Sequence, residues 1–284
     1  MTHSAYAVEY IMDDPREAMR LEMKVDPVAW VHKYVANRMA PGFEVLSVGC
    51  GPGLMLREIS TLDPSIRGTG LDISPSRVQT AREKNAGNRQ LKFVCGDAQE
   101  MQFARNSFDF VYSRMLFQYL PKKEQAMDEI VRVCRPGGTV LLQDLDGQLL
   151  WNYPEEPALQ SALHQVLGAL GKTGFDPFVG RKLFRLAQRA GLENLKVQVE
   201  CYHLIAGEPS RHILEQWKLK LDIALPQIAH VLGSERKAQE QIDRFIEYLS
   251  RPDTLTYSNV FTVTGEKPVL ESYREKAPAG TIKA

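Results

Sequence analysis

The stretch Val45–Leu54, VLSVGCGPGL, contains the pattern that decides the fold. Residues 45–48 form a short apolar run with β-branched side chains, which is typical of a buried parallel strand. Glycines at positions 49, 51 and 53 then permit a tight turn and a close approach of the backbone to a ligand. We expect a helix to begin at Leu54, so that unpaired backbone N–H groups at its start face the contents of a pocket.

The glycine spacing separates three known versions of this turn. A phosphate loop of the nucleotide hydrolases ends in Gly-Lys-Ser/Thr, which is absent here. The dinucleotide fingerprint GxGxxG needs its third glycine at position 54, where this chain has Leu54. The remaining pattern, GxGxG, resembles motif I of the class I methyltransferases that use S-adenosylmethionine. A glycine turn after a strand is in other proteins only a turn, so this motif does not decide the function by itself.

Length and charge limit the classes of partner. A chain of 284 residues suits one large α/β domain with insertions, or one domain with a small cap. Lys plus Arg equals Asp plus Glu at 35 each, so no overall field favours nucleic acid or a membrane surface. We therefore expect a small-molecule substrate, no nucleic acid and no membrane insertion.

Cysteine usage and the N-terminal sequence suggest the compartment. Cys50, Cys95, Cys134 and Cys201 are far apart and form no CxxC pair, which is typical of reduced structural thiols in the cytoplasm. The N-terminus shows no basic start followed by an apolar core, and no apolar run is long enough to span a bilayer. We expect a cytoplasmic protein.

Strand-like and helix-like segments alternate from Phe43 to about Leu142, which predicts a parallel sheet with crossover helices. Ser74 before Pro75 is typical of a helix start, and the Pro-Gly-Gly at 136–138 is expected to turn the chain into the next strand. Residues 151–173 are expected to form a connection that contains a helix. The predicted organisation is an N-terminal helical cap over 1–42, a core over 43–206 and 253–266, a helical insertion over 207–252 that forms a substrate lid, and a tail over 267–284.

Two acidic residues follow the next two predicted strands. Asp72 lies 19 residues after Gly53, where a carboxylate can accept hydrogen bonds from both hydroxyls of a ribose. The alternative is that Asp72 caps the following helix. Asp97 follows the third strand, where its carboxylate can accept from an adenine amine while the Ala98 N–H donates to a ring nitrogen. A Gly-Asp pair is also ordinary turn chemistry.

The order and spacing of these motifs, together with FDFVYSR at 108–114 and RVCRPGGTVLL at 132–142, resemble the class I methyltransferases. The resemblance is to the small-molecule branch that includes the ubiquinone and menaquinone C-methyltransferases. It covers about residues 45–142, and residues 180–192 more loosely. It implies a doubly wound, Rossmann-like sheet of seven strands with the last strand antiparallel, and S-adenosylmethionine as cofactor.

The resemblance also implies roles for individual residues. The residues implied to bind the cofactor are Ser47, Gly49, Cys50, Gly51 and Gly53 in the glycine turn, Asp72 and Ile73 at the ribose, Asp97 and Ala98 at the adenine, and Ser113 at the methionine portion. Ser47 departs from the family, which commonly has an acid there, so this position contributes no charge toward the cofactor's ammonium group. Arg20 is a candidate for the cofactor carboxylate, and the alternative is a solvated helix charge.

Methyl transfer from a sulfonium requires mainly that donor and acceptor are aligned and that water is excluded. If the acceptor is a hydroxyl or an activated carbon, a base helps; His203 is the first candidate and His164 the second, although a lone histidine is more often a packed side chain. The predicted substrate wall comprises Tyr10, Phe117, Gln118, Trp151 and Tyr153, which favours an apolar or aromatic metabolite, although each of these side chains is individually typical of a core.

Four further interpretations complete the prediction. Asp144 and Asp146 lack a further ligand at suitable spacing, so we predict no metal site. A protein of the same fold that binds the cofactor without transferring a methyl group is the alternative function, and Ser47 favours it. A nicotinamide oxidoreductase is disfavoured by Leu54. The amphipathic N-terminal helices and the insertion are surfaces through which chains could pair as a homo-oligomer.

Overall fold

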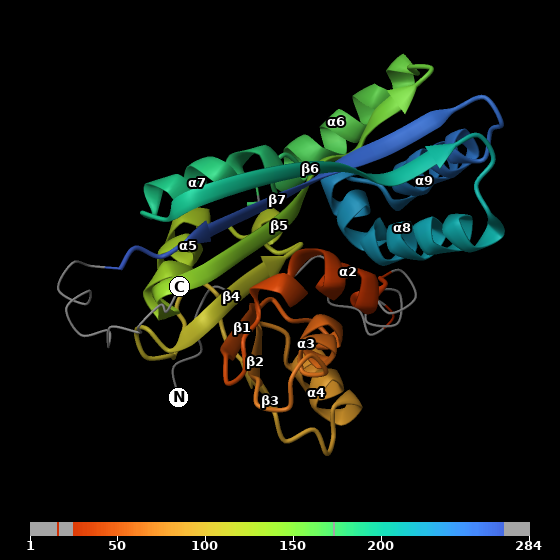
Figure 1. Cartoon of the computed structure of the whole chain (residues 1–284). Coiled ribbons are helices and arrows are strands. Elements are labelled where there is room, and N and C mark those ends of the chain that lie inside the picture. The colour runs from red at the N-terminus through yellow and green to blue at the C-terminus, as the bar shows by residue number, and fades with distance from the viewer. Residues whose placement is uncertain (1–15, 17–24, 173, 270–284) are drawn as a thin grey trace, which may run out of the picture.

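A seven-stranded sheet forms the centre of the molecule (Figure 1). The computed structural model describes residues 16, 25–172 and 174–269. The strands are β1 Glu44–Val48, β2 Arg67–Asp72, β3 Leu91–Cys95, β4 Phe108–Arg114, β5 Cys134–Tyr153, β6 Glu193–Ala206 and β7 Leu255–Glu266. They lie in the order β3-β2-β1-β4-β5-β7-β6, and β7 runs antiparallel to both of its neighbours. The predicted doubly wound sheet with an antiparallel last strand is confirmed.

Helices cover both faces of this sheet. Three helices pack on one face: α2 Pro27–Tyr34, α3 Leu54–Ile59 and α4 Pro75–Lys84. Two pack on the other: α5 Lys123–Val133 and α7 Leu183–Arg189. The short 3₁₀ turns are η1 Ala36–Arg38, η2 Phe117–Tyr119 and η3 Gly180–Lys182. Because side chains alternate along a strand, Val45 points into the first core and Leu46 into the second, which explains the apolar run of β1.

Side-chain caps fix where two of these helices begin. Asp26 Oδ1 accepts a hydrogen bond from the Ala29 N–H at 2.9 Å, and Pro27 follows as the first helical residue of α2. Ser74 Oγ accepts from the Arg77 N–H at 3.4 Å ahead of Pro75, so the predicted start of α4 is confirmed.

β5 differs from its prediction at both ends. The turn expected at 136–138 lies inside the strand, where the pairing with β4 shifts between Phe108 and Phe110 and Gly137 adopts a φ of +78°. The Gly137 N–H donates to the Lys267 carbonyl at 2.8 Å, so the chain stays hydrogen-bonded as a bulge instead of leaving the sheet. The expected connection from residue 151 is also wrong at its start, because Trp151 pairs with Tyr257 on β7.

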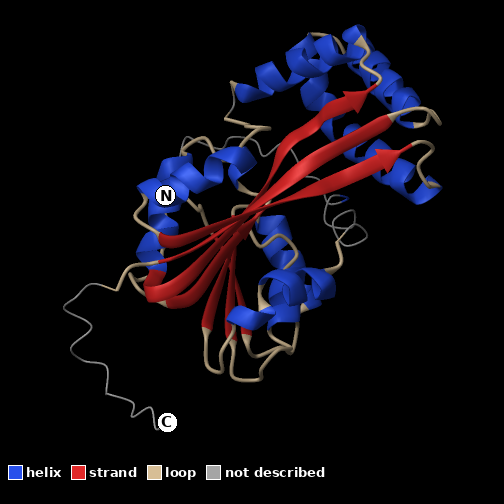
Figure 2. Ribbon diagram, turned by 45° about the horizontal axis from the view of Figure 1, so that its top comes forward, coloured by secondary structure: helices blue, strands red, loops and turns tan. Residues whose placement is uncertain are grey.

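The extended parts of β5, β6 and β7 support a second layer of helices beyond the core (Figure 2). We call this the lid layer; it consists of α6 Pro157–Gly171, α8 Arg211–Leu232 and α9 Glu235–Leu249, which share a hydrophobic cluster of their own. α8 and α9 lie within the range 207–252 that was assigned to the insertion, and Gly233 ends α8 with a φ of +66°. α6, which was expected to belong to the core region, packs with them.

None of the helices in the described ranges is both long enough and apolar enough to cross a bilayer.

α2 is fastened across the sheet by polar contacts to distant strands. The Trp30 Nε1–H donates to Gln143 Oε1 on β5 at 2.7 Å, inside the protein. The Tyr34 hydroxyl donates to Glu200 on β6 at 2.7 Å, and Lys33 forms an ion pair with the same carboxylate. These contacts hold α2 beside the carboxyl ends of the central strands.

We expect Trp30→Phe to lower the free energy of unfolding by about 2 kcal/mol, because the buried hydrogen bond to Gln143 is lost and the smaller ring leaves a gap. Urea unfolding followed by circular dichroism measures this change. Val28→Ala on the same helix is the control, since Val28 is 49% exposed and its truncation is expected to change stability by less than about 0.5 kcal/mol. Equal free energies for the two variants would show that this contact does not hold α2.

Candidate functional site

The glycine loop between β1 and α3 is packed tightly at both ends and open in the middle. Gly49, Gly51 and Gly53 all adopt positive φ values, of +74°, +53° and +78°. A Cβ at Gly53 would lie 2.7 Å from the Phe93 ring, whereas a Cβ at Gly51 would meet no described atom within 4 Å. The loop therefore packs closely against Phe93 at Gly53 and leaves space beside Gly51.

Asp72, at the end of β2, ties this loop to the start of α4. Its Oδ2 accepts from the Gly51 N–H at 2.8 Å and its Oδ1 from the Ser74 N–H at 3.0 Å. An ionised carboxylate has about four acceptor positions, so two remain for hydroxyl donors. Ile73 beside it is 53% exposed, which gives the site an apolar surface. Asp72 thus supports both backbone segments and keeps acceptor capacity for a ligand.

Asp97 lies on the neighbouring strand end. Its Oδ1 accepts from the Gln99 N–H at 2.8 Å, and the Gln99 side-chain amide lies 3.1 Å from both carboxylate oxygens. Ala98 is buried next to it. The Gly96 N–H donates to the Asp72 carbonyl at 2.9 Å, which places the two acids on one edge of the sheet. The structure brings the predicted nucleoside-binding residues together.

Ser47 lies beside another uncharged polar side chain, that of Tyr112. Ser47 is buried on β1, in register with Tyr112 on β4. Burial raises the pKa of the Tyr112 hydroxyl well above its ordinary value, so the side chain stays uncharged. No carboxylate therefore stands at this point, as the sequence indicated.

Cys50 fills space inside the glycine loop. A Cβ at Gly70 would lie 2.8 Å from its Sγ. Burial, and secondly the nearby Asp72 carboxylate, raises the pKa of the Cys50 thiol well above its ordinary value, so the reactive thiolate is disfavoured. All four cysteines are free thiols, as the spacing predicted.

A buried polar cluster lies behind the turn that follows β4. Ser113 and Gln118 are almost completely buried, and neither Ser113 Oγ nor Gln118 Oε1 has a hydrogen-bond partner among the described residues. Asp144 on β5 accepts from the N–H groups of Gln118 at 3.2 Å and Leu145 at 2.8 Å, and its burial raises its pKa to about 7. Buried polar atoms without hydrogen-bond partners are uncommon, so they mark a place where a ligand can supply the missing partners.

From the sequence, Asp144 and Asp146 stand out only as two acids that lack a further metal ligand at suitable spacing. In the structure Asp146 forms an ion pair with Arg181, whose Nε lies 2.9 Å from both carboxylate oxygens. No cluster of three or more metal-ligating side chains occurs in the part of the chain that the structure describes. The only sequence signal for Asp144 was an acid placed two residues beyond an apolar strand run, which gives no indication of full burial.

The remaining predicted residues do not form one wall. Phe117 lies in the core beneath α5 and α7, Trp151 stacks on Tyr257 at 6.4 Å on the strand extension, and Tyr153 is 71% exposed at its end. Only Gln118 of this group lies in the buried polar cluster. Tyr10 and Arg20 lie outside the described residues.

The two candidate bases lie on β6 and α6. His203 occupies a bulge of β6 with a φ of +56°, and its ring packs edge-on against Trp217 with a centroid distance of 5.1 Å. Its Nδ1 lies 3.4 Å from Ser258 Oγ. His164 is exposed on α6, with Nδ1 2.8 Å from the Gln160 carbonyl. A catalytic role for either histidine stays a prediction.

A family model described as a methyltransferase domain matches residues 46–142. By this match, residues 46–142 form a methyltransferase domain similar to those of the class I S-adenosylmethionine-dependent methyltransferases. The matched residues of the methyltransferase domain contain the glycine loop, both acids at the sheet edge, and Ser113. The family resemblance seen in the motifs is confirmed.

Similar proteins extend this finding. The chain is 35% identical over 133 residues to 2-methyl-6-phytyl-1,4-hydroquinone methyltransferase of a Synechocystis species, which covers 45% of this chain and 42% of that protein. Phosphoethanolamine N-methyltransferase 2 of Haemonchus contortus, solved with S-adenosylhomocysteine, superposes with a TM-score of 0.55, 17% identity and coverage of 86% and 52%. A [4+2]-cyclase superposes with a TM-score of 0.57, 20% identity and coverage of 85% and 81%.

The chain spans less than half the length of the curated relatives that it matches. At 17% and 20% identity the two solved structures establish the fold of the methyltransferase domain and its flanking elements, and not its substrate.

The residues present fit S-adenosylmethionine. The space above Gly51 admits a ligand beside the loop, and Asp72 retains acceptor positions for hydroxyls. The exposed Ile73 offers an apolar contact, and Ser113 Oγ lacks a partner among the described side chains. The predicted nucleoside end carries the carboxyl side chains of Asp72 and Asp97, whereas the predicted methionine end carries the hydroxyl groups of Ser47 and Tyr112.

Proposed function

We propose that this protein transfers a methyl group from S-adenosylmethionine to the oxygen, nitrogen or carbon of a small, mainly apolar metabolite. The observation that carries the proposal is the Asp72 carboxylate, which holds the glycine loop through Gly51 and retains two acceptor positions at the carboxyl edge of the sheet. A carboxylate in this position suits the paired hydroxyls of a ribose.

The chain's own residues would bind and orient both reactants. Glycines 49, 51 and 53 would flank the methionine portion of the cofactor, Asp72 and Ile73 the ribose, and Asp97 with Ala98 the adenine. When bound, S-adenosylmethionine supplies a methyl group activated by a sulfonium. Ser113, at the end of β4, would orient the reacting portion, and the lid layer would exclude water from it. Fixing the geometry of two reactants in this way contributes up to roughly 7–11 kcal/mol to lowering a barrier.

The alternative is a protein that binds the cofactor but does not transfer a methyl group. Two observations support keeping it: Ser47 stands where the family commonly has an acid, and a [4+2]-cyclase shares the fold. The fold therefore does not decide between transfer and binding, and a test must detect the methylated product.

The test combines binding with product detection. Calorimetric titration with S-adenosylhomocysteine is expected to show one saturable site per chain. The protein is then incubated with a labelled methyl donor and an extract of small metabolites, and a labelled product soluble in organic solvent is expected. NAD is titrated in competition as the control for a nicotinamide site. Binding without any labelled product would favour the alternative, and displacement by NAD would contradict both.

A further inference from the structure

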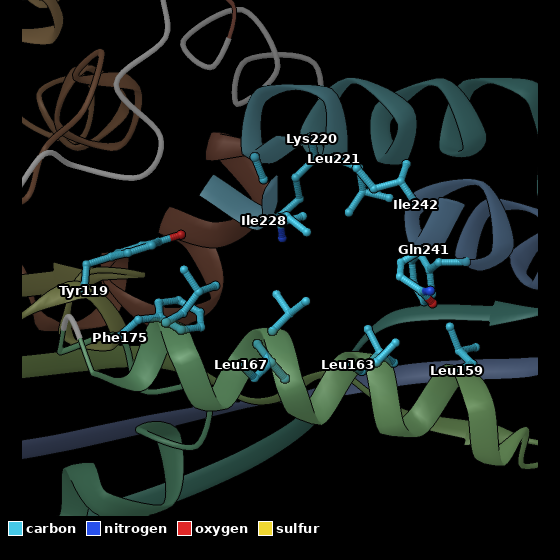
Figure 3. Close-up of a pocket in the computed structure, with 15 residues that line it drawn as sticks. Tyr119, Leu159, Leu163, Leu167, Phe175, Lys220, Leu221, Ile228, Gln241 and Ile242 are labelled. Atoms are coloured by element: carbon cyan, nitrogen blue, oxygen red, sulfur yellow. The ribbon is translucent and has the colours of Figure 1, made fainter. Parts of the chain in front are cut away.

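The lid layer forms an apolar cavity of about 120 Å³ between α6, α8 and α9, and this cavity is partly open to solvent (Figure 3). Leu159, Leu163 and Leu167 line it from α6, and Leu221, Ile228 and Ile242 line it from the two other helices. An engineered protein cavity of about 150 Å³ lined by similar side chains binds benzene. The space is thus of a size to accept an apolar ring or a branched segment of a chain.

The cavity is elongated along α6. Its α6 lining runs from Leu159 to Leu170, with apolar residues that recur every three or four positions on one face. Eleven residues of helix rise by roughly 16 Å. Leu163, Val166 and Leu167 on this stripe are only partly buried, so apolar surface remains for a ligand to cover.

One turn of the chain links this cavity to the glycine loop. At one end of the turn, Leu116 side-chain atoms lie 3.1 Å from the point where a Cβ on Gly49 would stand. At the other end, Tyr119 lines the cavity and contacts Phe175 with a ring centroid distance of 5.5 Å. Tyr119 and Phe175 lie together at one end of the cavity in Figure 3. The Tyr119 end of the cavity therefore lies on the side of the turn that follows β4 and contacts the glycine loop.

The far end of the cavity carries a polar atom. Gln241 on α9 lies at the end opposite Tyr119 (Figure 3), and its Oε1 is buried with no hydrogen-bond partner among the residues that the structure describes. Lys220, which also lines the cavity, places its ammonium 4.9 Å from the Trp217 ring centroid. The other lining residues are apolar apart from the Tyr119 hydroxyl, so we expect the ligand to be apolar along most of its length.

From this geometry we propose that the lid layer binds the apolar tail of the methyl acceptor, an alkyl or prenyl chain, with the acceptor group at the Tyr119 end. This inference rests on the proposed function and names the substrate class of that site. The tail enters past Tyr119 and Phe175 and lies along the stripe of α6.

The experiment measures binding of the fluorescent probe N-phenyl-1-naphthylamine to the full chain, and its displacement by primary alcohols from 1-butanol to 1-decanol. Saturable fluorescence enhancement is expected. The displacing affinity should rise by about fourfold per methylene until the cavity is filled, because each buried methylene contributes a constant increment. Probe binding that does not saturate, or alcohols that compete equally at all lengths, would overturn the proposal.

Two matched variants locate the site. Ala162 lines the cavity, and Ala162→Leu fills part of it, so probe affinity should fall at least tenfold. Ala158, one turn earlier on α6, is exposed and outside the lining, so Ala158→Leu should leave it unchanged. Gln241→Leu removes the polar atom without a partner and is expected to tighten probe binding at least threefold, which tests the site independently if Ala162→Leu does not fold. Equal affinities for all three variants and the natural chain would contradict the assignment.

A parallel titration with S-adenosylhomocysteine separates the two proposals. Both ligands are expected to bind, and Ala162→Leu should leave the affinity for S-adenosylhomocysteine unchanged. If S-adenosylhomocysteine binds and the probe does not, the proposed binding of an apolar tail is wrong. The same result is expected if another segment of the chain already fills the cavity, and it contradicts the proposal equally. If the probe binds and S-adenosylhomocysteine does not, methyl transfer fails while the apolar site stands.

Discussion

Asp72→Ala is expected to weaken the binding of S-adenosylhomocysteine by about 100-fold or more. The substitution removes the acceptors proposed for the ribose hydroxyls, and it also releases the Gly51 and Ser74 N–H groups that the carboxylate now holds. A hydrogen bond to a charged group contributes about 1.5–3 kcal/mol, and losing about 3 kcal/mol corresponds to roughly 100-fold in affinity. Calorimetric titration of both proteins measures the change directly.

Asp109→Ala is the matched control for this prediction. Asp109, near the start of β4, also accepts from a backbone N–H, that of Glu44 at 2.8 Å, and forms an ion pair with Arg135. It lies at the amino edge of the sheet, away from the glycine loop. We expect it to lower stability while leaving S-adenosylhomocysteine affinity within about twofold. If Asp72→Ala behaved as this control does, the ribose assignment would be wrong.

The second large effect is a change in how stability depends on pH when Asp144 is replaced by asparagine. Burial raises the folded-state pKa of Asp144 to about 7 from its ordinary 3.8, while backbone N–H groups and the Arg114 charge oppose the shift. Between these two values the folded protein keeps the proton and the unfolded chain releases it. Stability therefore falls as pH rises, by up to about 1.4 kcal/mol per pH unit, and the full range corresponds to about 4 kcal/mol.

Asp144→Asn removes this titration. We expect the free energy of unfolding of the variant, relative to the natural chain, to increase by about 3 kcal/mol between pH 5 and pH 8. Urea unfolding at four pH values in this range measures the difference, and any constant cost of the lost N–H acceptor cancels in the comparison. Ser113→Ala, on the neighbouring strand, is the control, because it alters a buried polar side chain without removing a titrating group. A difference that stays constant with pH would show that Asp144 remains ionised in the folded protein.

The glycine loop and its acids could be predicted from the sequence because their interactions are local. Gly49 to Gly53, the helix start at Leu54 and the Ser74–Pro75 cap are fixed by neighbouring residues whose conformations are restricted by their own chemistry. Asp72 follows a strand that parallel pairing brings beside β1, so its meeting with the loop also followed from the alternation of strands and helices. The second role of Asp72, as the support of Gly51, did not follow from spacing.

Tertiary structure alone decided the extension of the sheet and the lid layer. Trp151 to Tyr153 read as a connection because their partners, Leu255 to Tyr257, lie about 100 residues away, and pairing over such a separation leaves no local periodic signal. α6 joined α8 and α9 for the same reason, since the apolar stripe of a helix predicts burial but not the surface that buries it.

The same distinction holds for the site. The sequence determined a sheet, a glycine turn and two acids at one edge, because these depend on residues close together in the chain. The tertiary structure decided that Asp144 is enclosed, that Ser47 stands opposite Tyr112, and that the turn after β4 joins the glycine loop to an apolar cavity. Burial and the identity of a contact partner depend on segments that meet only when the chain folds, and these contacts determine which substrate the site can hold.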